Sequence, residues 1–81
     1  MAEEVTRDIA DILHLTYDWV ARKYTEVTVP LATIYAAHPA IRALEASMEQ
    51  AALANDLPTV KDRCREYCTT WGRVIQQVTT P

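Results

Sequence analysis

Two cysteines and two histidines are the residues of this chain that come nearest to a metal-binding set. Cys64 and Cys68 lie one helical turn apart, whereas His14 and His38 lie far from the cysteines and from each other in sequence. Zinc is held by thiolates and imidazoles, usually from closely spaced pairs on turns. Because these four residues lack that spacing, we expect no metal and no other cofactor.

The two cysteines fit the pattern of a packed helix. Cys64 lies in the middle of an apolar stripe, and free cysteine is among the residue types most often buried, so we expect Cys64 in the core. Cys68 leaves a redox role open, because the neighbouring Arg65 would lower the thiol pKa if that thiol were exposed. A disulfide between residues so close on one helix is unfavourable, which is consistent with a reducing compartment.

The sequence does not predict a catalytic site. Such a site needs a nucleophile, a base and an orienting group that converge on a pocket. Ser47 is the single serine, and nothing in the sequence places His14 or His38 beside it. We therefore expect a protein that is not an enzyme.

Apolar residues recur at spacings of three and four along two long stretches, which predicts two amphipathic helices. The first runs from about Glu4 to about Tyr24 and the last from Thr59 to Val78. The apolar face of the last helix consists of Val60, Cys64, Tyr67, Trp71, Ile75 and Val78. The apolar arc of the first helix is wider, so we expect that helix to touch two neighbours and to be the central element of a bundle.

Two further helices are predicted between these. A short helix follows Thr28, whose side chain can cap it, and ends at His38, because the residue before a proline is pushed out of the helical region. A third helix follows from Pro39 to about Ala54. The segment Asn55–Pro58 combines a residue suited to the left-handed conformation with a capping aspartate. The third and last helices should therefore form an antiparallel hairpin.

The predicted fold is an all-α, small bundle of three main helices plus one short helix, in a single domain over residues 1–81. The chain is 49% hydrophobic and 23% charged, and its one glycine and four prolines are too few turn residues for a sheet-rich fold. The single glycine, Gly72, lies inside the last helix, which indicates either a close backbone approach there or simple tolerance. No signal peptide is evident, and no apolar run approaches the roughly 20 residues that span a bilayer. We expect a cytoplasmic protein that does not contact membranes.

A small protein without a catalytic pattern is expected to act through its surface. We predict a non-catalytic protein–protein interaction module, an accessory or regulatory subunit that docks on a partner protein or forms a homodimer. The predicted contact residues are Leu13 and Val20 on the wide arc of the first helix, together with Tyr17 and Tyr35. These two tyrosines are the aromatic residues that a single core accommodates least readily, and exposed aromatic residues are frequent interface anchors.

Charge leaves two alternatives open. A stripe on the last helix could contact nucleic acid, as in an accessory protein; it consists of Lys61, Arg65, Arg73 and Gln76. Asp62 and Glu66 interrupt this stripe, and the net charge of −3 is the opposite of the usual footprint, so nucleic acid is not the expected partner. Conversely, residues 1–26 hold six acids against three bases. An inhibitor could mask a basic partner with Asp8, Asp11 and Asp18.

Overall fold

The computed structural model describes residues 2–79 and is built from four helices. These are α1 (Ala2–Tyr24), α2 (Leu31–Ala37), α3 (Pro39–Leu53) and α4 (Leu57–Thr79). No strand occurs within the described range. The prediction of an all-α protein with three main helices and one short helix is confirmed.

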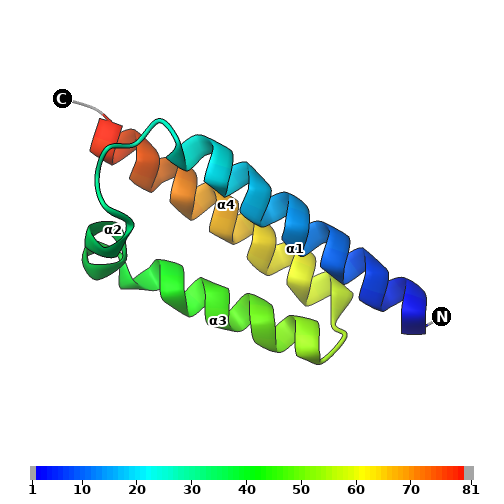
Figure 1. Cartoon of the computed structure of the whole chain (residues 1–81). Coiled ribbons are helices and arrows are strands. Elements are labelled where there is room, and N and C mark those ends of the chain that lie inside the picture. The colour runs from blue at the N-terminus through cyan, green and yellow to red at the C-terminus, as the bar shows by residue number, and fades with distance from the viewer. Residues whose placement is uncertain (1, 80–81) are drawn as a thin grey trace.

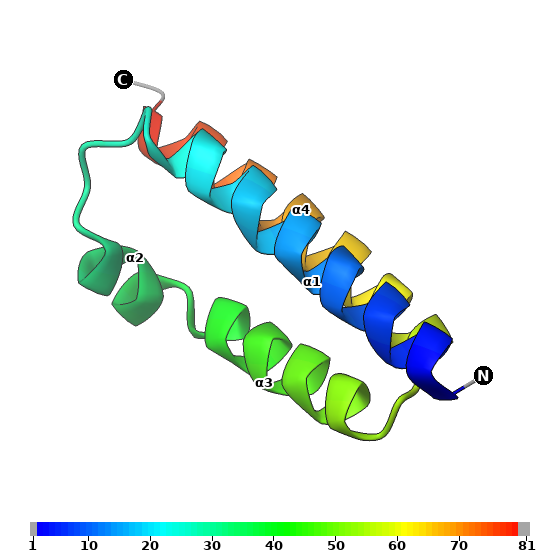
Figure 2. The same cartoon turned by 45° about the vertical axis from the view of Figure 1, so that its right-hand side comes forward.

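α4 is the central helix of the molecule. It packs against α1 on one side and against α3 on the other, while α1 and α3 have little direct contact. Figures 1 and 2 show α1 and α4 side by side and running in the same direction, with α3 antiparallel to both and α2 at one end. The prediction that the first helix is central is wrong, because α3 does not pack against the second side of its wide apolar arc. That side is left beside a groove.

The α3–α4 turn forms as its residues predict. Asn55 has a φ of 53°, the left-handed conformation that ends a helix. Asp56 caps α4, since its Oδ1 accepts a hydrogen bond from the Thr59 amide at 3.3 Å and its Oδ2 accepts one from the Thr59 hydroxyl at 2.7 Å. The antiparallel hairpin is confirmed, and α4 begins at Leu57, two residues before the predicted start.

The connection between α1 and α2 differs from the prediction. Thr28 does not cap α2, which begins at Leu31 after Pro30 and has no side-chain cap. The connector is held instead by Tyr24, whose hydroxyl donates a 2.8 Å hydrogen bond to the Val29 carbonyl. As predicted, His38 separates α2 from α3.

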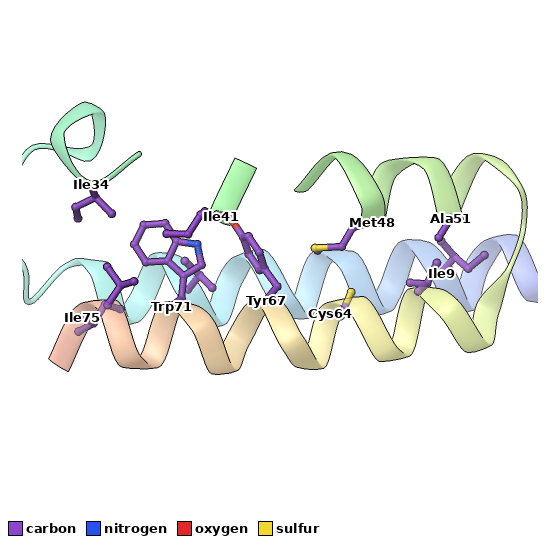
Figure 3. Close-up of a cluster of buried hydrophobic side chains, with 12 residues drawn as sticks. Ile9, Ile34, Ile41, Met48, Ala51, Cys64, Tyr67, Trp71 and Ile75 are labelled. Carbon is purple, nitrogen blue, oxygen red and sulfur yellow. The ribbon is translucent and has the colours of Figure 1, made fainter. Parts of the chain in front are cut away.

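The buried core follows α4 (Figure 3). Its members come from all four helices and are Ile9, Val20, Ile34, Ile41, Met48, Ala51, Val60, Cys64, Tyr67, Trp71, Val74 and Ile75. Trp71 is 1% exposed and Tyr67 is 2% exposed, so the largest rings of the predicted α4 face lie at its centre. Val78 is only partly buried, and Val74 is buried although it was not assigned to that face.

Gly72→Ala is expected to stabilise the protein. A Cβ at this position would have the Trp19 ring 4.0 Å away as its nearest neighbour, which is ordinary van der Waals contact. Alanine in a helix interior is favoured over glycine by about 1 kcal/mol, which raises the Tm of a domain of this size by roughly 4–8 °C. Thermal unfolding followed by circular dichroism at two protein concentrations measures this. A lower Tm would contradict this prediction, and a loss that grows with protein concentration would indicate that a second copy of the chain contacts Gly72 closely.

Candidate partner-binding groove

An open groove runs between α1 and α3 and consists of two adjoining hollows. The first, here called the apolar hollow, has a volume of about 410 Å³. It is lined by Thr6, Ile9, Ala10, Leu13, Tyr17, Glu49, Ala52 and Leu53. The second, here called the aromatic hollow, has a volume of about 300 Å³. It is lined by Tyr17, Val20, Ala21, Tyr24, Leu31, Tyr35, Glu45, Tyr67 and Trp71. Tyr17 lines both hollows, so they form one continuous surface.

Large apolar side chains are exposed along this groove. Leu53 at the end of α3 is 81% exposed, and Tyr17 and Leu31 are each 42% exposed. Single exposed apolar residues are normal, but several along one concave surface are characteristic of a binding site. Because α1 and α3 do not close over the groove, these side chains remain available to another molecule.

The aromatic hollow contains a carboxylate bound by two phenols. The hydroxyl groups of Tyr35 and Tyr67 both donate to Oε2 of Glu45, at 2.5 and 2.7 Å. Burial and the hydrogen bond to Glu45 raise the pKa of Tyr35 to about 12, and the same two causes raise the pKa of Tyr67. Burial and then the charge of Glu45 also raise the pKa of Tyr17. The tyrosines are therefore neutral hydrogen-bond donors at physiological pH.

The rings of the aromatic hollow are held by edge-to-face packing around Trp71. The Trp71 ring lies 6.1 Å from Tyr35, 6.3 Å from Tyr24 and 6.5 Å from Tyr67, measured between centroids. Tyr17 extends the cluster, with its ring 5.6 Å from that of Tyr67. Such arrangements are favoured by the ring quadrupoles and give each ring a fixed orientation. The wall of the hollow is therefore preorganised by packing from α1, α2 and α4.

The four predicted contact residues meet at this groove. Leu13 and Tyr17 line the apolar hollow, and Tyr17, Val20 and Tyr35 line the aromatic hollow. Val20 is buried, so it supports the hollow more than it offers surface. Glu45 was not predicted, because a glutamate on a helix is normally solvated and its two phenol partners lie 10 and 22 residues away along the chain.

The predicted nucleic-acid stripe lies on the outer face of α4, away from the groove. Lys61, Arg65, Arg73 and Gln76 are all exposed. Arg65 and Arg73 share a polar depression with Asp62 and Glu66. The adjacent Arg63 forms ion pairs of 3.3 Å with Asp62 and 3.4 Å with Glu66. This face is mixed in charge, which is not the continuous basic surface that phosphate binding favours.

The acidic residues proposed as an inhibitory surface lie along α1. Asp8 and Asp11 are exposed, whereas Asp18 is partly buried and pairs with Arg22 at 3.0 Å. Arg22 therefore already neutralises part of the negative charge at this end of α1. Contacts with a basic partner remain a prediction for Asp8, Asp11 and Asp18.

The cysteine, histidine and serine side chains do not converge on one site. Cys64 is buried, as predicted, and Cys68 is partly buried; both are free thiols. Burial raises the pKa of Cys68, which opposes the lowering that Arg65 would cause at an exposed thiol. His14 is exposed on α1, and Ser47 is partly buried on α3. Between residues 2 and 79, no group of three histidine, cysteine or acidic side chains is placed to hold a metal ion.

A second exposed apolar pair lies on α1 but does not line the groove. Leu15 is 65% exposed and Trp19 is 38% exposed, with the Lys23 Nζ 5.8 Å from the centroid of the Trp19 ring. Trp19 lies beside Gly72 of α4. This pair offers matched control positions for the groove residues.

The fold and the groove define a small all-α bundle with an open apolar surface between two of its helices. None of the helices in the described part of the chain is both long and apolar enough to cross a membrane. Neither a protein-family model nor a curated protein nor a solved structure matches the chain significantly.

Proposed function

We propose that this protein is a non-catalytic interaction module that binds an amphipathic helix of a partner protein in the groove between α1 and α3. The observation that carries the proposal is the open groove itself, which is lined by exposed apolar side chains from both helices. A helix placed there would contact α1 and α3 together and would complete a four-helix arrangement. Recognition of an amphipathic helix by an apolar groove is a recurring binding mode.

Charge on the groove favours a basic partner helix. Glu49 is the one charged residue that lines the apolar hollow, and Glu45 is the one that lines the aromatic hollow. Both are acidic side chains. A helix that presents apolar side chains at spacings of three and four, flanked by lysine or arginine, would match both the surface and its charge.

The same charges argue against a symmetric homodimer through this groove. A two-fold dimer places the same patch of both copies face to face. Glu45 and Glu49 would then meet the same acidic groove of the second copy, and like charges at a partly desolvated interface are unfavourable. The predicted homodimer is therefore the alternative outcome of the test and not the preferred one.

A selection from a displayed library of amphipathic helical peptides tests the proposal, with the full chain as the target. Enriched peptides are expected to carry apolar residues at spacings of three and four together with at least one basic residue. Leu53→Lys should weaken binding of a selected peptide by roughly ten-fold or more, because it removes an exposed apolar contact and adds positive charge. Fluorescence anisotropy measures the affinity.

Leu15→Lys is the matched control, since it makes the same change at an exposed leucine that does not line the groove. It is expected to leave peptide affinity unchanged. Equal losses in both variants would contradict binding in the groove. A stable dimer by light scattering that Leu53→Lys dissociates, with no peptide enriched, would assign the groove to self-association instead.

A further inference from the structure

The aromatic hollow differs from the apolar hollow in its chemistry. Five of its lining residues carry aromatic rings: Tyr17, Tyr24, Tyr35, Tyr67 and Trp71. Glu45 is its one charged lining residue. Aromatic faces carry the negative part of the ring quadrupole, and cations bind to them favourably when they are desolvated. A carboxylate among such rings gives the hollow two independent attractions for a positive charge.

No cation from the described residues forms an ion pair with Glu45. Its two hydrogen bonds come from neutral phenols and both reach Oε2. No lysine, arginine or histidine nitrogen between residues 2 and 79 lies within the 4.0 Å ion-pair distance of its carboxylate. The carboxylate is held in place by the fold, yet it has no ionic partner in this part of the chain.

Tyr35 already contacts a cation. The guanidinium carbon of Arg42 lies 4.2 Å from the centroid of the Tyr35 ring. Arg42 is exposed and does not line the hollow. Its charge opposes a second cation nearby, so binding depends on the attraction of Glu45 and of the rings that Arg42 does not contact.

We propose that the aromatic hollow binds the cationic head group of a basic side chain, an ammonium or guanidinium group carried by the helix that occupies the apolar hollow. That a partner helix supplies the cation rests on the proposed function. That the hollow attracts a cation does not depend on it. Because Tyr17 lines both hollows, a helix lying along the groove passes from one to the other. Tyr67 and Trp71 are buried, so the cation would stand against the more exposed rings of Tyr17, Tyr24 and Tyr35, close to Glu45.

The chemistry of the hollow is tested with a small probe. The full chain is titrated with tetramethylammonium chloride, and the ring resonances of Tyr17 and Tyr35 are followed by NMR. We expect saturable chemical-shift changes with tetramethylammonium. Two controls at the same concentration should not produce them: 3,3-dimethyl-1-butanol, a neutral molecule with a similarly branched head, and sodium chloride. Equal shifts with the neutral alcohol, or no saturable shift with the cation, would overturn the cation site.

Glu45→Gln provides the matched variant. The amide oxygen can still accept both phenol hydroxyls, so the hollow keeps its shape while its charge is removed. Affinity for tetramethylammonium is expected to fall roughly ten-fold. Circular dichroism confirms that the variant is folded, and an unchanged affinity in a folded variant would contradict the role of Glu45.

The source of the cation is tested with a groove-binding peptide and its lysine-to-norleucine analogue. The analogue should bind the natural chain more weakly, and that difference should largely disappear in Glu45→Gln, as a double-mutant cycle requires when two groups interact. Peptides that bind the groove without this coupling would overturn the inference and leave the proposed function intact. If tetramethylammonium binds but no peptide does, the proposal that a partner helix supplies the cation is contradicted.

Discussion

Trp71→Ala is expected to remove a large part of the protein's stability. Trp71 is 1% exposed and packs against Tyr24, Tyr35 and Tyr67, which come from α1, α2 and α4. Truncation of a fully buried tryptophan costs about 3–5 kcal/mol. A chain of this length has a total stability of roughly 4–12 kcal/mol. Urea unfolding followed by far-UV circular dichroism should show a midpoint shifted far to lower urea, or no folded baseline at all.

Trp19→Ala is the control for this prediction, because it makes the same truncation at a residue that is 38% exposed. Trp19 contacts Lys23 and lies beside Gly72, but it is not a member of the core. Its loss should cost about 1 kcal/mol, a typical effect of a single substitution. If the two substitutions cost the same, Trp71 is not the centre of the core.

The core of α4 could be predicted because helical spacing determines which side chains share a face. Cys64, Tyr67 and Trp71 fall on that face by sequence alone, and all three are buried. The α3–α4 turn could be predicted for a local reason too, since Asn55 tolerates the left-handed conformation and Asp56 caps the next residues. Local rules of this kind need no knowledge of the other helices.

The helix order could not be predicted in the same way. A wide apolar arc indicates that α1 has two sides to cover, but it does not indicate whether the same chain covers both. In the structure α4 takes the central position, and Leu13 and Tyr17 remain at an open groove. Which faces meet depends on how the connectors direct the helices, and the α1–α2 connector is fixed by a tyrosine-to-carbonyl hydrogen bond that no periodicity reveals.

Glu45 shows a second limit of sequence analysis. Its position, four residues after Ile41 and three before Met48, places it on the buried face of α3 by helical spacing. Its role arises only when α2 and α4 bring two phenols to the same carboxylate oxygen. Leu53 was missed for a related reason, because it is the last residue of α3 and lies outside the apolar pattern of that helix. A groove forms between elements, so the pattern within one helix does not show which residues of another helix complete it.

The tyrosine cluster predicts that the folded state loses stability in alkaline solution. Burial and the hydrogen bond to Glu45 raise the pKa of Tyr35 to about 12 and raise that of Tyr67 as well. In the unfolded chain these groups titrate near their ordinary pKa of about 10. Above that pH the unfolded state binds fewer protons than the folded state, so the free energy of unfolding falls as pH rises. Below about pH 10 the contribution is fully present.

Urea midpoints measured from pH 8 to pH 11 should therefore decline gently at first, because burial also raises the pKa of Cys68, and then steeply above about pH 10. Tyr67→Phe removes the most buried phenol of the cluster, and Tyr35→Phe removes its neighbour. Each variant should be less stable at pH 8, because Glu45 loses a hydrogen-bond donor, and each should show a shallower decline above pH 10. If the decline is as steep in the Tyr35→Phe, Tyr67→Phe double variant as in the natural chain, groups other than Tyr35 and Tyr67 cause it. That result would also contradict the idea that the Glu45 carboxylate organises the hollow.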